Sequence, residues 1–163
     1  ALNEYLNNYQ KSIPDEHIFF CENSAVNAIL SYFSEQARTF GITYTVSASI
    51  PKHIFISETD LSILFGNLLE NAIDACNAQS GEDKKIIVRA KTDNHSLCVT
   101  IDNTFSGSLD IDQEGHFVSS KHEGLGLGTE SIKSIAEKYG GVCQFESNNG
   151  MFYASVMCFK DHA

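Results

Sequence analysis

One amphipathic segment constrains the fold more than any other part of the chain. Between about Asp60 and Asn77, apolar residues recur at steps of three and four, as on one face of an α-helix. These apolar residues are Leu61, Leu64, Phe65, Leu68, Leu69, Ala72, Ile73 and Cys76. A helix with such a continuous apolar face needs a sheet or other helices to cover it. We expect Thr59 or Asp60 to cap its N-terminus.

The segments around this helix predict an α+β domain. Two further helices are expected at 23–39 and 129–139, the latter with Ile132, Ile135 and Ala136 along one side. Strands are expected at 41–49, 85–93 and 95–103, and as a pair joined by an Asn-Asn-Gly turn within 142–159. Residues 104–128 are rich in Ser, Gly and Asp and are expected to lack regular structure. The predicted fold is an α+β two-layer sandwich, in which about three helices cover one face of a mixed β-sheet.

The charge balance narrows the classes of partner. The chain of 163 residues has 11 Lys and Arg against 21 Asp and Glu, a net charge of −10, and no basic cluster. Nucleic-acid binding depends on neutralising many phosphates, so it is not expected. A single nucleotide remains compatible, because backbone N–H groups and Mg²⁺ neutralise a triphosphate without a basic patch.

The five cysteines form no CxxC pair. They are Cys21, Cys76, Cys98, Cys143 and Cys158. We expect five buried, reduced thiols, with a zinc site or a disulfide framework as the alternative.

The polar side of the long helix carries a second signal. Asn67, Glu70, Asn71 and Asp74 follow one another at i, i+3, i+4 and i+7, opposite the leucines. A solvated helix face is one interpretation. A Mg²⁺ site is the other, because Asn is a poor helix former and its amide oxygen is a hard ligand.

Two motifs resemble the boxes of one superfamily. NLLENAIDA (67–75) resembles the N-box of the GHKL, or Bergerat-fold, superfamily, and EGLGLGTESI (123–132) resembles its second glycine box. Within it, the segments NLLENAIDAC and SSKHEGLGLGTESIKSIAEKYGG are most similar to the Agr-type, peptide-sensing quorum-sensing receptor kinases. The resemblance extends over about residues 22–159 and implies a Bergerat fold that binds ATP and Mg²⁺.

The resemblance implies a role for each residue of the asparagine face. Asn71 corresponds to the family's Mg²⁺ ligand. Asn67 occupies the position where hydrolysing members have a Glu that activates water, and an amide cannot accept that proton. Phosphoryl transfer to a histidine is therefore implied rather than hydrolysis. Glu70 and Asp74 flank the ligand and either hold metal-bound water or are solvated.

The adenine pocket departs from the family pattern. The first glycine box usually reads D-x-G-x-G, whereas this chain has TIDNTFSG (100–107). Val99 and Ile101 are expected to point to the core, so Asn103 rather than Asp102 is expected to contact adenine. Phe105 replaces the first glycine and Gly107 matches the second. A simple turn that no longer binds adenine is the alternative.

The second glycine box implies a lid over the triphosphate. Gly124, Gly126 and Gly128, with Leu127 between them, are expected to approach the phosphates closely. The helix that follows the glycines is expected to direct its free N–H groups at the same phosphates. Lys121 either contacts the β- and γ-phosphates or is a solvated loop lysine.

The histidines suggest a missing partner domain. None of the six lies on a predicted helix in the acidic context of a phosphoacceptor, and His122-Glu123 lies in the predicted lid. We expect residues 1–14 to end an upstream dimerisation and phosphoacceptor helix, and residues 15–163 to form the ATP-binding catalytic domain. Since no starting Met is present, the chain is expected to be part of a longer protein.

The expected parent is a membrane-anchored, homodimeric receptor with this domain in the cytoplasm, acting on a response regulator. Two alternatives remain open at this point. One is a GHKL ATPase, and the other is a regulatory domain that has lost nucleotide binding.

Overall fold

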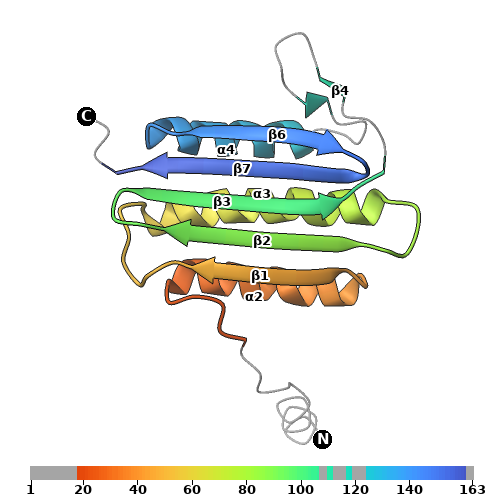
Figure 1. Ribbon diagram of the computed structural model, residues 1–163, viewed down its shortest axis with the longest axis horizontal. Coiled ribbons are helices and arrows are strands. Elements are labelled where there is room, and N and C mark those ends of the chain that lie inside the picture. The colour runs from red at the N-terminus through yellow and green to blue at the C-terminus, as the bar shows by residue number, and fades with distance from the viewer. Residues whose placement is uncertain (1–17, 107–109, 112–116, 119–123, 161–163) are drawn as a thin grey trace, which may run out of the picture.

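A five-stranded mixed sheet forms one layer of the molecule. The computed structural model describes residues 18–106, 110–111, 117–118 and 124–160. The strands lie in the order β1-β2-β3-β7-β6 (Figure 1). Their bounds are β1 Thr43–Ser49, β2 Lys85–Thr92, β3 Ser96–Thr104, β6 Val142–Asn148 and β7 Met151–Phe159. Only the β1–β2 pair is parallel within this sheet, so the predicted mixed sheet is confirmed.

Three helices form the second layer on one face of the sheet (Figure 1). They are α2 Ser24–Thr39, α3 Glu58–Ala78 and α4 Gly124–Lys138. The helix α2 contacts β1, α3 contacts β2 and β3, and α4 contacts β6 and β7. The middle helix α3 contacts both neighbours, so the predicted α+β two-layer sandwich is confirmed.

The core lies between the two layers. All eight apolar residues predicted on the long helix are buried, as are Ile132, Ile135 and Ala136 of α4. Burial alternates along β3, where Leu97, Val99 and Ile101 face the helices. Burying each large apolar side chain contributes about 1.5–3 kcal/mol, so this contact holds α3 on the sheet.

The N-terminus of α3 corrects one prediction. The helix begins at Glu58, and Ser57 is its cap, with Ser57 Oγ accepting a hydrogen bond from the Asp60 N–H at 3.1 Å. Thr59 and Asp60 are therefore not the cap, because both already lie within the first turn. Asp60 instead makes side-chain contacts with the end of α4.

The N-terminus of α4 corrects a second prediction. The helix begins at Gly124 rather than after Gly128, so the glycines form its first turns. Each glycine costs a helix about 1 kcal/mol relative to Ala, which is why the sequence favoured a loop. The preceding segment also contains a short antiparallel pair, β4 Asp110–Ile111 and β5 Phe117–Val118.

The strand connections follow the turn signals in the sequence. Asn149 and Gly150 have φ values of 49° and 77° between β6 and β7, as a tight hairpin turn requires. After α4, Gly141 lies directly against β7: a Cβ at this position would stand 1.7 Å from the Met157 carbonyl oxygen. Gly141 is therefore required for the close approach of α4 and β7.

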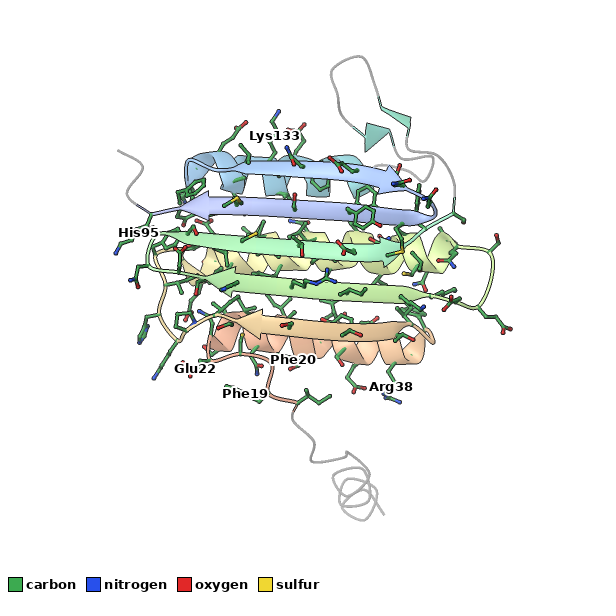
Figure 2. All side chains as sticks on the ribbon, in the orientation of Figure 1. Phe19, Phe20, Glu22, Arg38, His95 and Lys133 are labelled. Atoms are coloured by element: carbon green, nitrogen blue, oxygen red, sulfur yellow. The ribbon has the colours of Figure 1, made fainter. Side chains whose placement is uncertain are left out.

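The segment before α2 is tied to that helix. The Asn27 side-chain oxygen accepts hydrogen bonds from the N–H groups of Phe20 and Cys21, at 2.7 and 3.3 Å. Figure 2 shows Phe19 and Phe20 along this segment. Phe20 packs edge-on against Tyr44 of β1, which fixes the segment on the sheet as well.

Two further features bear on the sequence predictions. Cys21, Cys76 and Cys158 are buried, but Cys98 and Cys143 are only partly buried, which corrects the expectation of five buried thiols. None of the helices in the described part of the chain is long and apolar enough to cross a bilayer.

Candidate functional site

The four polar residues along one side of α3 form two pairs, an inner pair that is half-buried and an outer pair that is exposed. Asn67 and Asn71 are half-buried, whereas Glu70 and Asp74 are exposed. The Asn67 amide nitrogen donates to the Ile63 carbonyl one turn earlier, at 2.9 Å. This bond fixes the side chain and leaves its oxygen for other partners.

Gly128 of α4 meets the inner pair. A Cβ at Gly128 would stand 3.4 Å from the Oδ1 atoms of both Asn67 and Asn71, and 3.7 Å from Asn71 Nδ2. Gly128 is itself buried. The structure thus brings together residues of the two predicted boxes, which are about sixty positions apart in the sequence. The result is a close approach of helix backbone to two side-chain amides.

Asn103 lies at the end of β3 on the helix-facing side. It is 1% exposed, on the same face as Val99 and Ile101, so the predicted strand phase is confirmed. Its Nδ2 atom donates to the Thr104 carbonyl at 3.0 Å. Asp102 is on the opposite face, where its carboxylate accepts a hydrogen bond from Arg89 at 2.8 Å. The adenine contact itself remains a prediction.

An aromatic cluster lies beside Asn103 and was not predicted. Phe152 of β7 is the direct partner of Asn103 in the β3–β7 register. Its ring lies 6.2 Å from that of Phe105, at a tilt of 59°, and stacks on Phe145 at 6.1 Å. Phe105, at the position where the resemblance implied a glycine, therefore packs against the strand partner of Asn103. Phe105 is fixed further by its N–H, which donates to the Gly150 carbonyl at 2.9 Å.

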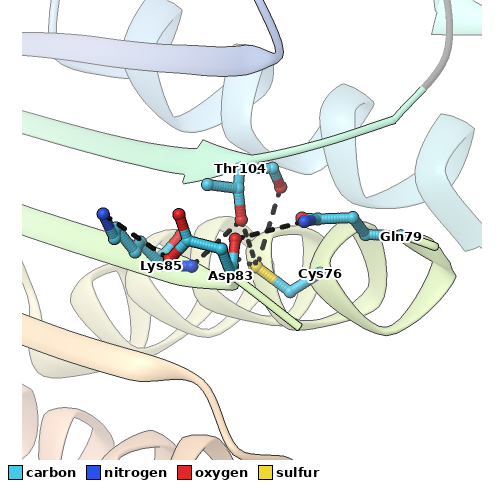
Figure 3. A network of polar contacts seen from close by, with 5 residues as sticks. All are labelled: Cys76, Gln79, Asp83, Lys85 and Thr104. Atoms are coloured by element: carbon cyan, nitrogen blue, oxygen red, sulfur yellow. Dashed lines mark hydrogen bonds and ion pairs between the residues drawn. The ribbon is translucent and has the colours of Figure 1, made fainter. Parts of the chain in front are cut away.

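A polar network holds the C-terminal end of α3 against β2 and β3 (Figure 3). The Cys76 thiol lies 3.6 Å from the Lys85 carbonyl and 3.7 Å from the Thr104 carbonyl. The Lys85 N–H donates to Thr104 Oγ1 at 3.0 Å. Burial raises the pKa of the Cys76 thiol, so it stays a neutral donor. The network fixes the end of β3, which carries Asn103, relative to Asn67 and Asn71 of α3.

Several predicted site residues have no described side-chain position. Gly107 and Lys121 lie outside the described residues. Gly124, Gly126 and Leu127 have a helical backbone in the first turns of α4. The start of this helix provides N–H groups without intrahelical partners, a favourable site for an anion.

The oxygen donors of the site fit a hard cation. Asn67 and Asn71 contribute amide oxygens, and Glu70 and Asp74 contribute exposed carboxylates on the same side of α3. Mg²⁺ prefers such oxygen donors, and it usually keeps several ligand positions for water and phosphate.

The chain is similar to known sensor proteins in sequence. The GHKL domain family matches residues 56–158, from before α3 to the end of β7. The "Probable C4-dicarboxylate sensor kinase" of Bacillus subtilis is 25% identical over 138 residues, 79% of this chain and 25% of the relative. The C4-dicarboxylate transport sensor protein DctB of Rhizobium meliloti is 37% identical over 84 residues, 50% of this chain and 13% of the relative. The chain thus spans a quarter or less of these relatives.

Solved structures share the fold. A nucleotide-free form of the catalytic domain of histidine kinase ThkA superposes with a TM-score of 0.66 at 21% identity, covering 85% of this chain and 93% of that chain. The mycobacterial sensor histidine kinase MprB gives a TM-score of 0.60 at 18% identity, covering 81% and 93%. The chain belongs to the GHKL family, and its fold is that of the catalytic domain of histidine kinases.

Proposed function

We propose that this chain is the ATP-binding catalytic domain of a sensor histidine kinase and transfers the γ-phosphoryl group of ATP to a histidine on another domain. The meeting of Asn67, Asn71 and Gly128 at the crossing of α3 and α4 supports this proposal most directly. It brings oxygen donors for Mg²⁺ next to the start of α4, whose first N–H groups lack intrahelical partners and favour an anion.

The proposed roles follow from position and chemistry. Asn71 holds Mg²⁺, whose charge offsets that of the phosphates, and Asn67 orients the triphosphate. Glu70 and Asp74 bind metal-coordinated water. Gly107, Lys121 and the glycine box of Gly124, Gly126, Leu127 and Gly128 contact the nucleotide. Asn103 accepts from the adenine amino group and donates to N1.

The asparagine at position 67 favours transfer over hydrolysis. An amide does not accept a proton at neutral pH, so water beside Asn67 lacks a general base there. Catalysis would then rest on positioning and charge neutralisation, with an imidazole as the attacking group. A GHKL ATPase is the second candidate, supported by the shared fold and disfavoured by this residue.

The wider setting is also proposed rather than shown. We place residues 1–14 at the end of an upstream dimerisation and phosphoacceptor domain and residues 15–163 in the catalytic domain. The parent is then a membrane-anchored, dimeric receptor with this domain in the cytoplasm, signalling to a response regulator. The box sequences support the finer assignment to the Agr-type, peptide-sensing branch.

Labelled phosphate tests the proposed reaction. The chain is incubated with ATP labelled at the γ-phosphate, alone and with the histidine-bearing domain of its own receptor. We expect acid-labile label on the partner's histidine and none on the chain. Label on the chain alone, or release of inorganic phosphate without transfer, would contradict the assignment.

A further inference from the structure

One buried carboxylate joins the two helices of the candidate site. Asp60, in the first turn of α3, is 8% exposed and is the only charged residue that is buried in the described ranges. Its carboxylate accepts hydrogen bonds from Lys138 Nζ at 2.8 Å and from the Tyr139 hydroxyl at 2.5 Å. Lys138 is the last residue of α4 and Tyr139 directly follows it, 78 and 79 positions after Asp60.

The Tyr139 hydroxyl is inserted into the start of α3. It donates to Asp60 and accepts from the backbone N–H of Ser57, the cap residue of α3, at 3.2 Å. The Tyr139 carbonyl accepts from the Phe159 N–H of β7 at 2.9 Å. The C-terminal end of α4 is therefore attached both to α3 and to the sheet.

The two helices touch at a second point, further along. There Gly128 lies against Asn67 and Asn71. Since α4 contacts later residues of α3 at its start and earlier residues at its end, the helices run antiparallel. Position 128 precedes position 138 by a helical span of about 15 Å. Two contacts separated in this way fix both the sliding and the rotation of one helix on the other.

Packing alone does not require a charge at the first contact. Burying the Asp60 carboxylate costs desolvation even though Lys138 is largely exposed, and apolar residues of similar volume often give equal stability at such a position. A charge pair does, however, restrict the register, because a slip removes both hydrogen bonds from a buried carboxylate. A one-turn slip toward the C-terminal end of α4 would also replace Gly128, which fits against the asparagines, by Ser131 or Ile132, which carry side chains.

We propose that Asp60, held by Lys138 and Tyr139, is a positioning residue for nucleotide binding: it sets the register of α4 that places Gly128 on Asn67 and Asn71. This inference rests on the proposed function. Asp60 itself contacts no nucleotide, and its effect passes through α4 alone.

A matched pair of hydroxyl deletions tests the inference. Tyr139→Phe removes the contact to Asp60. Tyr44→Phe is the control, because the Tyr44 hydroxyl likewise joins two elements, donating to the Leu30 carbonyl of α2 at 3.1 Å, away from the α3–α4 contact. Lys138→Gln and Lys138→Arg form a second pair at a largely exposed side chain that leaves the core intact. All are measured by calorimetric titration with a non-hydrolysable ATP analogue and Mg²⁺, and by urea unfolding.

We expect Tyr139→Phe and Lys138→Gln to weaken analogue binding about tenfold, or about 1.4 kcal/mol, because a shift of α4 moves Gly128 away from Asn67 and Asn71. Tyr44→Phe is expected to lower stability without changing affinity, and Lys138→Arg to retain binding. Wild-type affinity in both Tyr139→Phe and Lys138→Gln would overturn the inference but not the proposed function.

NMR distinguishes a failure of the inference about Asp60 from a failure of the proposed function. Without nucleotide, Tyr139→Phe is expected to shift the Gly128 amide and the side-chain amides of Asn67 and Asn71, whereas Tyr44→Phe leaves them unchanged. If the wild type binds no analogue, the proposed function fails, and these resonances still decide whether Asp60 sets the register. If the Gly128, Asn67 and Asn71 resonances do not shift in Tyr139→Phe, the inference that Asp60 sets the register of α4 is overturned.

Discussion

Gly128 of α4 lies so close to Asn71 of α3 that an added Cβ would stand 3.4 Å from the Asn71 side-chain oxygen. That distance is an ordinary van der Waals contact, so a methyl group fits without disturbing the fold. It would nevertheless place a methyl group against the two amide oxygens that we assign to the Mg-ATP site.

Gly128→Ala is therefore expected to separate stability from binding. Alanine favours a helix by about 1 kcal/mol over glycine, so urea unfolding should show equal or higher stability. The affinity for an ATP analogue with Mg²⁺ should fall about tenfold, or about 1.4 kcal/mol, because the methyl group crowds both amide oxygens. Gly66→Ala is the control, because nothing lies within 4 Å of its added Cβ on α3. Unchanged affinity in Gly128→Ala would show that the phosphates do not approach this crossing.

Gly141→Ala is expected to damage the fold itself. Its Cβ would stand 1.7 Å from the Met157 carbonyl oxygen, so α4 and β7 would have to separate. The loss should exceed about 3 kcal/mol, as for other severe backbone clashes. Thermal unfolding measures this loss, with Gly66→Ala as the control. A midpoint for Gly141→Ala equal to that of the wild type would contradict the close contact between Gly141 and β7.

Acid should remove the stabilising effect of Asp60. The hydrogen bond from Lys138, and secondly that from Tyr139, hold the pKa of Asp60 below its ordinary value of 3.8. A carboxyl whose pKa is lowered by folding stabilises the protein fully above that ordinary value, and the stabilisation disappears as pH falls through the lowered one. The wild type should exceed Asp60→Asn in free energy of unfolding above about pH 5, and the difference should shrink below pH 4. In a Lys138→Gln background this pH dependence should weaken, and a constant difference across the range would contradict the contact.

The cysteines should react in two groups. Cys98 and Cys143 are partly exposed, whereas Cys21, Cys76 and Cys158 are buried. Burial also raises the pKa of Cys158 to about 11, so only about one molecule in a thousand carries its thiolate at pH 8. A short iodoacetamide pulse followed by peptide mass spectrometry should label Cys98 before Cys158, and all five after denaturation. Early labelling of Cys158 would show that β7 is not covered as described.

Asn67→Glu tests why transfer is favoured over hydrolysis. A carboxylate here gives a general base to water, so Mg-dependent release of inorganic phosphate should rise above that of the wild type. Asn67→Gln is the control, since it lengthens the side chain without adding a base. Equal phosphate release from both variants would show that the lack of a base at position 67 is not the reason why transfer is favoured over hydrolysis.

The periodic parts of the fold could be predicted from the sequence. The apolar steps along α3 reflect its burial against the sheet and against α2 and α4, and strand alternation correctly put Asn103 with Val99 and Ile101. These features depend only on local geometry and on which face is covered.

Features that depend on distant contacts could not be predicted. Glycine propensity argued against a helix at Gly124, yet α4 begins there, and Gly128 lies buried against α3. The pairing of Asn103 with Phe152 needs the β3–β7 register, and that of Asp60 with Lys138 joins residues 78 positions apart. No local pattern in a single sequence encodes such contacts.

Calorimetric titration with a non-hydrolysable ATP analogue, with and without Mg²⁺, tests the central claim most directly. The wild type and Asn77→Ala, which changes an exposed asparagine on the same helix, should bind the analogue more tightly with Mg²⁺. Asn71→Ala should lose that Mg²⁺-dependent gain. Absence of binding in the wild type, or an unchanged Mg²⁺ dependence in Asn71→Ala, would contradict a Mg-ATP site on α3.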